Sequence, residues 1–418
     1  MRKKHFLFAS VLALLCGSSA LHAQDFKLTS SGYFKNQGVD IMAFDDIYPE
    51  GHQGGVCIIM NGHRVATNGD IRLEATPGQW QPVPKQLDRK LGDNSITATL
   101  CYPDSSRHLT GFNPMIYPDL HLIYTVNVES KGKNIEVTVD LDRPIPQEFI
   151  GKVGFNLEFF PGSLFGKPWI MDGQSGIFPQ QPNSPLMTTQ PNYLHTGNYH
   201  DGKKSLADMD KLIGKGYSPI VADDIISEPY AKGRKFTSRP DDPYNKVTIE
   251  SLSGDLQLFD GRMNHNNGWF VLRSNIKPGV TKGAVKWIIT PNVVADWMYQ
   301  PVIQTSQIGY HPAQDKEAVI EMDIRDNRKE TAQIIRIDAD GEKVVKNVTP
   351  ANWGKFLRYN YLKVDFTDVK EPGLYKIKYD TSVSPIFRID NDVYARGVWQ
   401  PVLEYFLPVQ MCHMRVNE

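Results

Sequence analysis

Apolar and polar residues alternate along most of the chain between Gln24 and Pro301, as they do in half-buried antiparallel strands. Asn61-Gly62 separates two apolar runs and predicts a hairpin turn, and the Lys131–Asn134 segment predicts another. Many short strands with frequent turns predict a large β-sandwich domain over residues 24–300. The predicted strands are 56–60, 64–67, 70–75, 95–100, 122–128, 134–141, 246–250, 256–261, 268–273 and 284–289.

Residues 161–245 interrupt this pattern, because prolines and glycines are frequent there. We expect long loops in this region, with one short helix capped by the Ser205–Asp208 segment and ended by glycine. A domain boundary is expected near Pro301, since Pro291 and Pro301 bracket a short segment.

A second, compact run of strand candidates occupies residues 301–390. Asp340-Gly341 and Pro372-Gly373 supply turns between them, because glycine tolerates positive φ. About ninety residues with such strands predict a small Ig-like β-sandwich, so the expected fold class is all-β. The candidates are 318–322, 333–337, 362–366, 374–379 and 386–389.

The first residues have the pattern of a signal peptide. A positive region at residues 2–4 precedes the apolar run Phe6–Leu15 and a small-residue exit that ends at Ala23. We expect residues 1–23 to be cleaved after Ala23, which would export the chain to the periplasm, the cell surface or the medium. The apolar run is too short to span a bilayer, so no transmembrane segment is expected.

The cysteines do not form a disulfide framework. Removing the expected signal leaves Cys57, Cys101 and Cys412, an odd and widely spaced set, which favours buried thiols over disulfides. Cys16 offers a lipoprotein alternative to simple cleavage, but the bulky Leu15 before it disfavours that reading.

The charge balance does not favour a polyanionic partner. The chain has 46 Lys and Arg residues against 47 Asp and Glu residues, for a formal net charge of −1. Nucleic acid is therefore not an expected partner. No clustered metal-ligand pattern is present, and we expect neither a metal nor another cofactor.

One stretch carries a family resemblance. Ser306–Pro312 reads S-Q-I-G-Y-H-P and resembles the N-Q-V-G-Y-x-P opening of the Ig-like domain that precedes the catalytic domain in glycoside hydrolase family 9. Ser306 departs from the usual Asn. Further features resemble that domain in the family's order, namely Lys316 with Ala318-Val319, Asp340-Gly341, Val364–Val369, Pro372–Tyr375 and Ser384–Ile389.

The resemblance implies what should follow residue 390. Residues 391–418 resemble the first helix of the family's (α/α)6 catalytic barrel, although Pro401 and Pro408 predict a broken or kinked helix. The family's D-A-G-D motif, whose Asp activates water, is absent from the 418 residues. We therefore expect no catalytic residue here and interpret the chain as the front part of a longer enzyme, with a genuine stop as the alternative.

Two sets of candidate site residues follow. The resemblance suggests that Gln307, Gly309 and Tyr310 have an inter-domain structural role, with the amide and phenol facing a neighbouring barrel. In the first domain, three residues are candidates for ring stacking or polar contact with sugar, and the default interpretation for each is core or loop packing. These three are Trp80, Trp169 and His265.

The leading hypothesis is the non-catalytic N-terminal portion of an exported family 9 β-glucanase. By resemblance, the full-length enzyme would hydrolyse plant β-1,4-glucan with inversion, and its partner would be that polysaccharide. The alternative is a self-sufficient carbohydrate-binding or surface adhesion module of two β-sandwiches. A third hypothesis is a separate enzyme with its site in the first domain.

Overall fold

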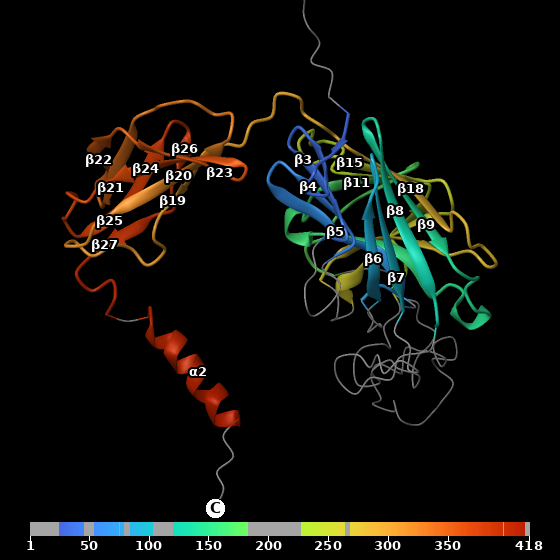
Figure 1. The fold of residues 1–418 in the computed structure, drawn as a ribbon. Helices are drawn as coiled ribbons and strands as arrows, with labels where there is room; N and C mark the ends of the chain where they lie inside the picture. Colours follow the sequence, from blue (N-terminus) through green and yellow to red (C-terminus); the bar gives the residue numbers. More distant parts are fainter. Residues whose placement is uncertain are drawn as a thin grey trace, which may run out of the picture. The chain divides into compact units, whose positions relative to one another are not determined.

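The structure is a computed structural model that describes residues 25–45, 54–74, 76–78, 84–102, 120–182, 227–263, 268–395 and 397–413. The chain divides into two compact units, Met1–Trp297 and Met298–Glu418, and each has its own hydrophobic core (Figure 1). A search of the described residues finds no helix that is long and apolar enough to cross a membrane.

The first unit is built from two nine-stranded antiparallel sheets, called here sheets A and B (Figure 1). Sheet A has the order β1 (Lys27–Leu28), β2 (Phe34–Asn36), β3 (Val39–Ala43), β4 (Val56–Met60), β5 (His63–Leu73), β10 (Val153–Phe159), β17 (Phe270–Asn275), β16 (Leu256–Asp260) and β13 (Ala231–Gly233). Sheet B has the order β12 (Gln174–Ile177), β11 (Pro168–Met171), β14 (Lys235–Ser238), β15 (Val247–Ser251), β18 (Val285–Pro291), β9 (Asn134–Leu141), β8 (Ile123–Lys131), β7 (Ser95–Cys101) and β6 (Lys85–Leu91).

The core of the first unit lies between these sheets. Buried residues alternate with more exposed ones along β8 and β9, which confirms the predicted half-buried strands. Trp287 of β18 is fully buried; its ring packs edge-on against Phe155 at 4.9 Å, and its indole N–H donates to Ser274 Oγ at 3.0 Å. One aromatic side chain of sheet B thus contacts two strands of sheet A.

Two sequence predictions for the first unit were wrong in detail. The segments 64–67 and 70–75 belong mostly to one strand, because β5 continues through Asn68 at a positive φ of 56° and its pairing with β4 is shifted by a bulge. The region 161–245 contains β11 to β14 as well as loops, and the expected helix after Ser205 lies outside the described residues. The described residues of this unit also include short 3₁₀ helices at Gln147–Phe149, Pro161–Ser163 and Gly261–Met263.

The second unit is a smaller sandwich of two antiparallel sheets, called sheets C and D. Sheet C has the order β19 (Val302–Gln304), β20 (Glu317–Asp323), β24 (Tyr359–Asp365) and β23 (Ala351–Phe356). Sheet D has the order β22 (Gly341–Val348), β21 (Ala332–Asp338), β25 (Gly373–Tyr379) and β26 (Ser382–Val383), with β27 (Phe387–Ile389) also paired to β25.

All five strand candidates predicted for this unit are present as β20, β21, β24, β25 and β27, which confirms the all-β prediction. Strands β19, β22, β23 and β26 were missed. Strands β19 and β26 have only three and two residues. Most residues of β22 and β23 are exposed on both faces, so these two strands lack the polar and apolar alternation from which the other strands were predicted.

One α-helix, α2 (Gln400–His413), follows the second sandwich. Pro401 does not break this helix as predicted, because it occupies the first turn, where its missing N–H has no intrahelical acceptor. The helix also continues past Pro408. Its described side chains from Val402 to Phe406 are exposed, and they include four large apolar residues, Val402, Leu403, Tyr405 and Phe406.

Candidate functional sites

The Ser306–Pro312 stretch is a turn that lies against strand β27. Gly309 adopts a φ of +104°, and a Cβ built on it would approach the carbonyl oxygen of Arg388 to 2.3 Å. Only glycine fits this position, because any side chain would need both an unfavourable φ and a displacement of the β27 backbone. Tyr310 then forms an isolated parallel bridge with Ile389 of β27.

Tyr310 lies in the core of the second unit, with 5% of its surface exposed. Its ring packs edge-on against Phe366 and Phe387 at 5.1 and 5.3 Å. Its hydroxyl donates to the Glu317 carbonyl at 2.9 Å and accepts from the Ser306 N–H at 3.0 Å. Burial raises the pKa of this phenol, so the hydroxyl stays protonated as a donor.

The inter-domain role of Gln307, Gly309 and Tyr310 stays a prediction, and these residues differ in their surroundings. Tyr310 joins the turn to its own sandwich, so its phenol is engaged inside the domain, whereas Gln307 and Ile308 are exposed. Apolar residues of neighbouring segments are exposed as well. Leu374 pairs with Arg388 of β27, Ile386 immediately precedes that strand, and both are about half exposed or more, at 47% and 61%. We call this group, with Ile308, Leu374 and Ile386, the β27 end of the domain. Exposed apolar residues on adjacent segments are typical of a surface that contacts another protein domain.

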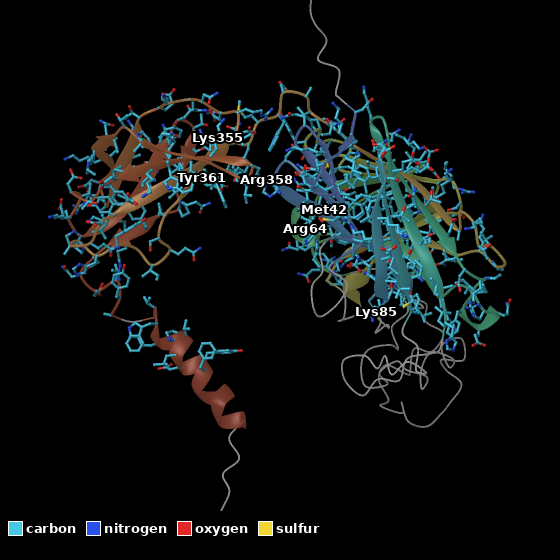
Figure 2. The ribbon with its side chains drawn as sticks, viewed as in Figure 1. Met42, Arg64, Lys85, Lys355, Arg358 and Tyr361 are labelled. Carbon is cyan, nitrogen blue, oxygen red and sulfur yellow. The ribbon has the colours of Figure 1, made fainter. Side chains whose placement is uncertain are left out.

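The outward side of sheet C carries aromatic rings where polar residues are usual. We call this group the aromatic face; it consists of Tyr299, Trp353, Phe356, Tyr359 and Tyr361. Trp353 and Phe356 are each 56% exposed, and the three tyrosines are partly exposed. Figure 2 labels Tyr361 with the cationic residues Lys355 and Arg358 of the same hairpin.

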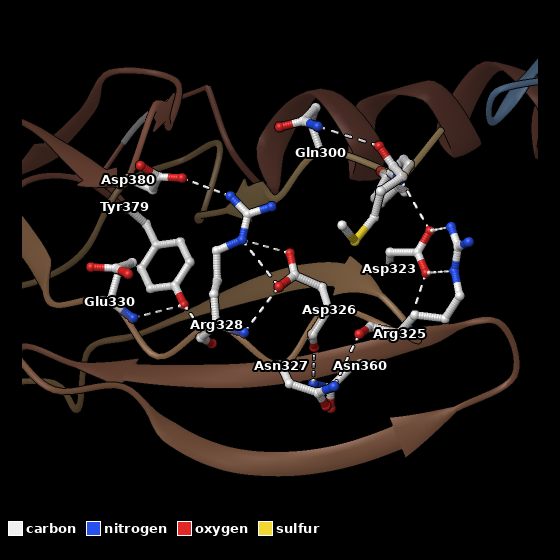
Figure 3. A network of polar contacts seen from close by, with 12 residues as sticks. Gln300, Asp323, Arg325, Asp326, Asn327, Arg328, Glu330, Asn360, Tyr379 and Asp380 are labelled. Atoms are coloured by element: carbon white, nitrogen blue, oxygen red, sulfur yellow. Dashed lines mark hydrogen bonds and ion pairs between the residues drawn. The ribbon is translucent and has the colours of Figure 1, made fainter. Parts of the chain in front are cut away.

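A polar network secures the loop after β20 (Figure 3), and it includes the backbone N–H of Tyr299. Asp323 accepts hydrogen bonds from Nε and Nη2 of Arg325, each at 2.8 Å, and from the Tyr299 backbone N–H at 3.0 Å. Partial burial alone would raise the pKa of Asp323, but these hydrogen bonds lower it to about 2. Arg328 contacts Asp326 at 2.8 Å and Asp380 at 2.6 Å, so we assign the network a structural role.

The first unit has a different polar group, on the side of sheet A that faces away from the core. Val153, Phe155, Leu157 and Phe159 of β10 point into the core, so the alternating Asn156 and Glu158 point outward, yet both are buried. The guanidinium of Arg273 donates to Glu74 Oε1 at 3.1 Å and to Asn156 Oδ1 at 3.2 Å. Asp70 and Arg72 lie 3.7 Å apart nearby on β5.

Two carboxyl groups of this network titrate near neutral pH. Burial raises the pKa of Glu74 from 4.5 to about 7, although Arg273 and Arg72 act in the opposite direction. Burial raises the pKa of Asp70 from 3.8 to about 6 against the influence of Arg72. Perturbed carboxyls can mark a catalytic site, but structural ion networks perturb pKa values in the same way. The Glu74 and Asp70 oxygens are held by Arg273, Asn156 and Tyr124, which favours the structural interpretation.

The other sequence candidates are located as follows. Trp80 and His265 lie outside the described residues. Trp169 of β11 is 6% exposed and belongs to the core, which agrees with the packing alternative for this residue. Cys57 and Cys101 are buried and outside any disulfide, as predicted. A search of the described residues finds no group of three or more His, Cys, Asp or Glu that could hold a metal ion.

The aromatic face was not predicted from the sequence. Tyr359-x-Tyr361 was a usable signal, because two aromatic residues spaced by two project to the same side of a strand. Trp353 could not be assigned to that side, because β23 was not recognised as a strand and a bulge between Asn352 and Gly354 shifts its register.

Comparisons with known proteins bear on the second unit. No protein with a curated description matches the chain. Among solved structures, it is similar to a metagenome-derived glycoside hydrolase family 9 endoglucanase, with 31% identity over 21% of this chain and 18% of that chain, at a TM-score of 0.20. A family 9 glycoside hydrolase from Bacteroides ovatus matches with 26% identity over 22% of this chain and 16% of that chain, at a TM-score of 0.19.

A zinc-binding triple mutant of the family 9 endoglucanase J30 matches with 27% identity over 20% of this chain and 15% of that chain, at a TM-score of 0.18. The chain thus spans less than a fifth of the length of each of these three structures. The family model for the cellulase N-terminal Ig-like domain matches residues 298–384, which confirms the resemblance seen at Ser306–Pro312. Residues 298–384 of this chain therefore form a cellulase N-terminal Ig-like domain.

Proposed function

We propose that this chain is the N-terminal, non-catalytic portion of an exported family 9 β-glucanase. In this proposal the Ig-like domain supports a catalytic (α/α)6 barrel, and the full-length enzyme hydrolyses β-1,4-linked plant glucans. The observation that carries the proposal is the match of residues 298–384 to the cellulase N-terminal Ig-like domain.

Two exposed apolar surfaces support the presence of a neighbouring barrel. At the β27 end of the Ig-like domain, Ile308, Leu374, Ile386 and Tyr394 are between 44% and 61% exposed. Isolated apolar residues at a surface are ordinary, but several on adjacent segments indicate a contact with protein. We assign this contact to the barrel.

Helix α2 provides the second surface. Trp399 lies directly before the helix and is 56% exposed, and Tyr405 within it is 68% exposed. A helix with this many exposed apolar side chains is stable only when another element covers them. We propose that α2 is the first helix of the barrel and that the following helices cover it.

Hydrolysis by the purified chain and by a longer product tests this proposal. The chain of 418 residues should release no reducing sugar from carboxymethylcellulose, mixed-linkage β-glucan or xyloglucan. The reading frame beyond codon 418 should encode a helical barrel with a D-A-G-D motif, and the longer product should hydrolyse at least one of these glucans. Hydrolysis by the 418-residue chain itself would contradict the proposal, and so would a stop codon directly after codon 418.

The second candidate function, a self-sufficient carbohydrate-binding module, is favoured by one observation, the aromatic face. Exposed aromatic rings on a sheet are a common way to hold sugar rings, because each pyranose has an apolar face of C–H groups. This candidate predicts binding to a polysaccharide without hydrolysis, and it predicts no catalytic domain in the same reading frame.

A further inference from the structure

We propose that the aromatic face of the Ig-like domain is a binding site for an extended β-glucan chain, with Trp353 and Tyr361 as its central contacts. The inference deepens and rests on the proposed function, from which the choice of a β-glucan as ligand follows. It assigns substrate binding to a domain whose proposed role above is only to support a barrel.

The rings form a continuous row across sheet C. The ring centroids of Tyr299 and Tyr359 are 5.0 Å apart, those of Tyr359 and Tyr361 are 6.2 Å apart, and those of Tyr361 and Trp353 are 5.7 Å apart. The planes of Trp353 and Tyr361 are perpendicular, at 90°. A row of rings suits an extended polymer better than a single sugar, because successive residues of the polymer can each contact one ring.

A β-bulge places Trp353 in this row. In the pairing of β23 with β24, Asn352 lies opposite Leu362, and Gly354 lies opposite Tyr361, so Trp353 is the additional residue. Gly354 has a φ of +122°, and a Cβ built on it would have no neighbour within 4 Å. The bulge therefore directs the indole to the side of Tyr361, and the glycine leaves the surface beside the two rings open.

Polar groups accompany the rings, as recognition of hydroxyl-rich chains requires. The hydroxyls of Tyr299 and Tyr361 donate to the two carboxylate oxygens of Glu321, each at 3.0 Å. These bonds fix the orientation of both rings before a ligand arrives, which reduces the entropy lost on binding. Partial burial and the bond to Glu321 both raise the pKa of Tyr361, so its phenol stays protonated and keeps its hydrogen bond to Glu321 across the physiological range.

The chemistry of the aromatic face favours a glucan over a protein partner. Its large side chains are aromatic, and its exposed aliphatic neighbours are Val302 of β19, opposite Glu321, and Leu357 at the tip of the hairpin. Lys355 and Arg358 are exposed at the same tip and can donate hydrogen bonds to sugar hydroxyls (Figure 2). The β27 end of the domain, by contrast, is rich in exposed Ile and Leu, as expected for contact with protein.

Affinity electrophoresis of the purified chain tests the proposal. Native gels with and without hydroxyethylcellulose, a soluble β-1,4-glucan, should show retarded migration of the wild type. Gels with soluble starch, an α-linked glucan, should show none. The Trp353→Ala and Tyr361→Ala variants should each weaken binding at least about tenfold, whereas Tyr361→Phe should keep most of the affinity because it keeps the ring.

A matched control is Tyr244→Ala, which removes a 49% exposed tyrosine from the first unit and should leave the retardation unchanged. Calorimetric titration with cellohexaose should reproduce the order of the variants. Retardation that persists in Trp353→Ala would overturn the proposal, and so would a wild type that is not retarded by any β-glucan. The proposed function is judged separately, by hydrolysis with the longer product.

The thermal stability of Trp353→Ala distinguishes the protein alternative. An indole that awaits a ligand can be removed with a change in Tm of at most a few degrees. A large drop in Tm, or a change in oligomeric state, would mean that the aromatic face is covered by another part of the chain or by a second copy. Either result would overturn the glucan site.

Discussion

The two sandwiches depart from the usual polar exterior of a sheet in opposite ways. In the first unit, the side of sheet A that faces away from the core holds Glu74, Asn156 and Arg273, and each is at most 1% exposed. In the second unit, the corresponding side of sheet C holds the aromatic face, where Trp353 and Phe356 are 56% exposed.

The difference shows that the chemical type of a residue does not indicate its role without its surroundings. Buried charge is costly unless each charged group is paired, and Arg273 satisfies this condition through Glu74, Asn156 and backbone carbonyls. Exposed aromatic surface is costly unless a ligand uses it. The charged group therefore stabilises the fold, whereas the aromatic group is available for binding.

The largest effect is expected from breaking the charged network. Arg273→Met should destabilise the first unit by about 3–5 kcal/mol, because it leaves the buried Glu74 carboxyl, the Asn156 amide and two backbone carbonyls without the guanidinium that donates to them. Calorimetry should show a lower Tm for one transition, while the transition of the second unit stays in place. Arg143→Met, at an arginine whose side chain is 54% exposed, should change stability by less than about 0.5 kcal/mol. Equal effects of the two substitutions would contradict the structural role of Arg273.

The pH dependence of the free energy of unfolding offers a second test of the buried network in the first unit. The folded-state pKa values of Asp70 and Glu74 are raised to about 6 and about 7, so the folded state holds these protons more tightly than the unfolded state. Their contribution to stability is full below the unfolded pKa values and is lost as the pH rises through the folded ones. We expect a loss of about 2 kcal/mol between pH 5 and pH 6.

Urea unfolding at a series of pH values measures how the free energy of unfolding changes with pH. Asp70→Asn and Glu74→Gln should each reduce this change, because each removes one of the two titrating groups. A first unit whose stability rises over this range would mean that both carboxylates are ionised at low pH and act as ordinary ion-pair partners.

The smallest of these effects concerns the core of the second unit. Tyr310→Phe should cost about 1–2 kcal/mol, because the Ser306 N–H and the Glu317 carbonyl lose their partner while the ring packing is kept. Tyr394→Phe removes the hydroxyl of a 44% exposed tyrosine and should cost less than about 0.5 kcal/mol. Equal losses of stability in the two variants would mean that the two hydrogen bonds of the Tyr310 hydroxyl do not stabilise the core.

The sequence predicted several strands whose two sides differ in burial, although it missed β3, which alternates, and β10, which is buried on both sides. Strands β8, β9 and β20 alternate in burial, and their sequences alternate with them. Strands β22 and β23 are exposed along most of their length, so hydrophobic periodicity could not identify them. Trp353 lies in β23 and was therefore not identified from the sequence, although the binding proposal depends on it most.

The sequence by itself determined local features, namely turns and short motifs. The motif at Ser306–Pro312, with the later turns and strands, carried the resemblance of the second unit to the cellulase N-terminal Ig-like domain. The structure explains its glycine, because the positive φ of Gly309 beside a neighbouring backbone admits only glycine. Only the tertiary structure decided which side of each sheet is covered. In the folded chain, Glu74 and Arg273, which are far apart in the sequence, are buried in contact with each other. Tyr299, Tyr361 and Trp353 likewise lie in one row only after folding. Those outcomes depend on strand pairing over long separations, which no local pattern encodes.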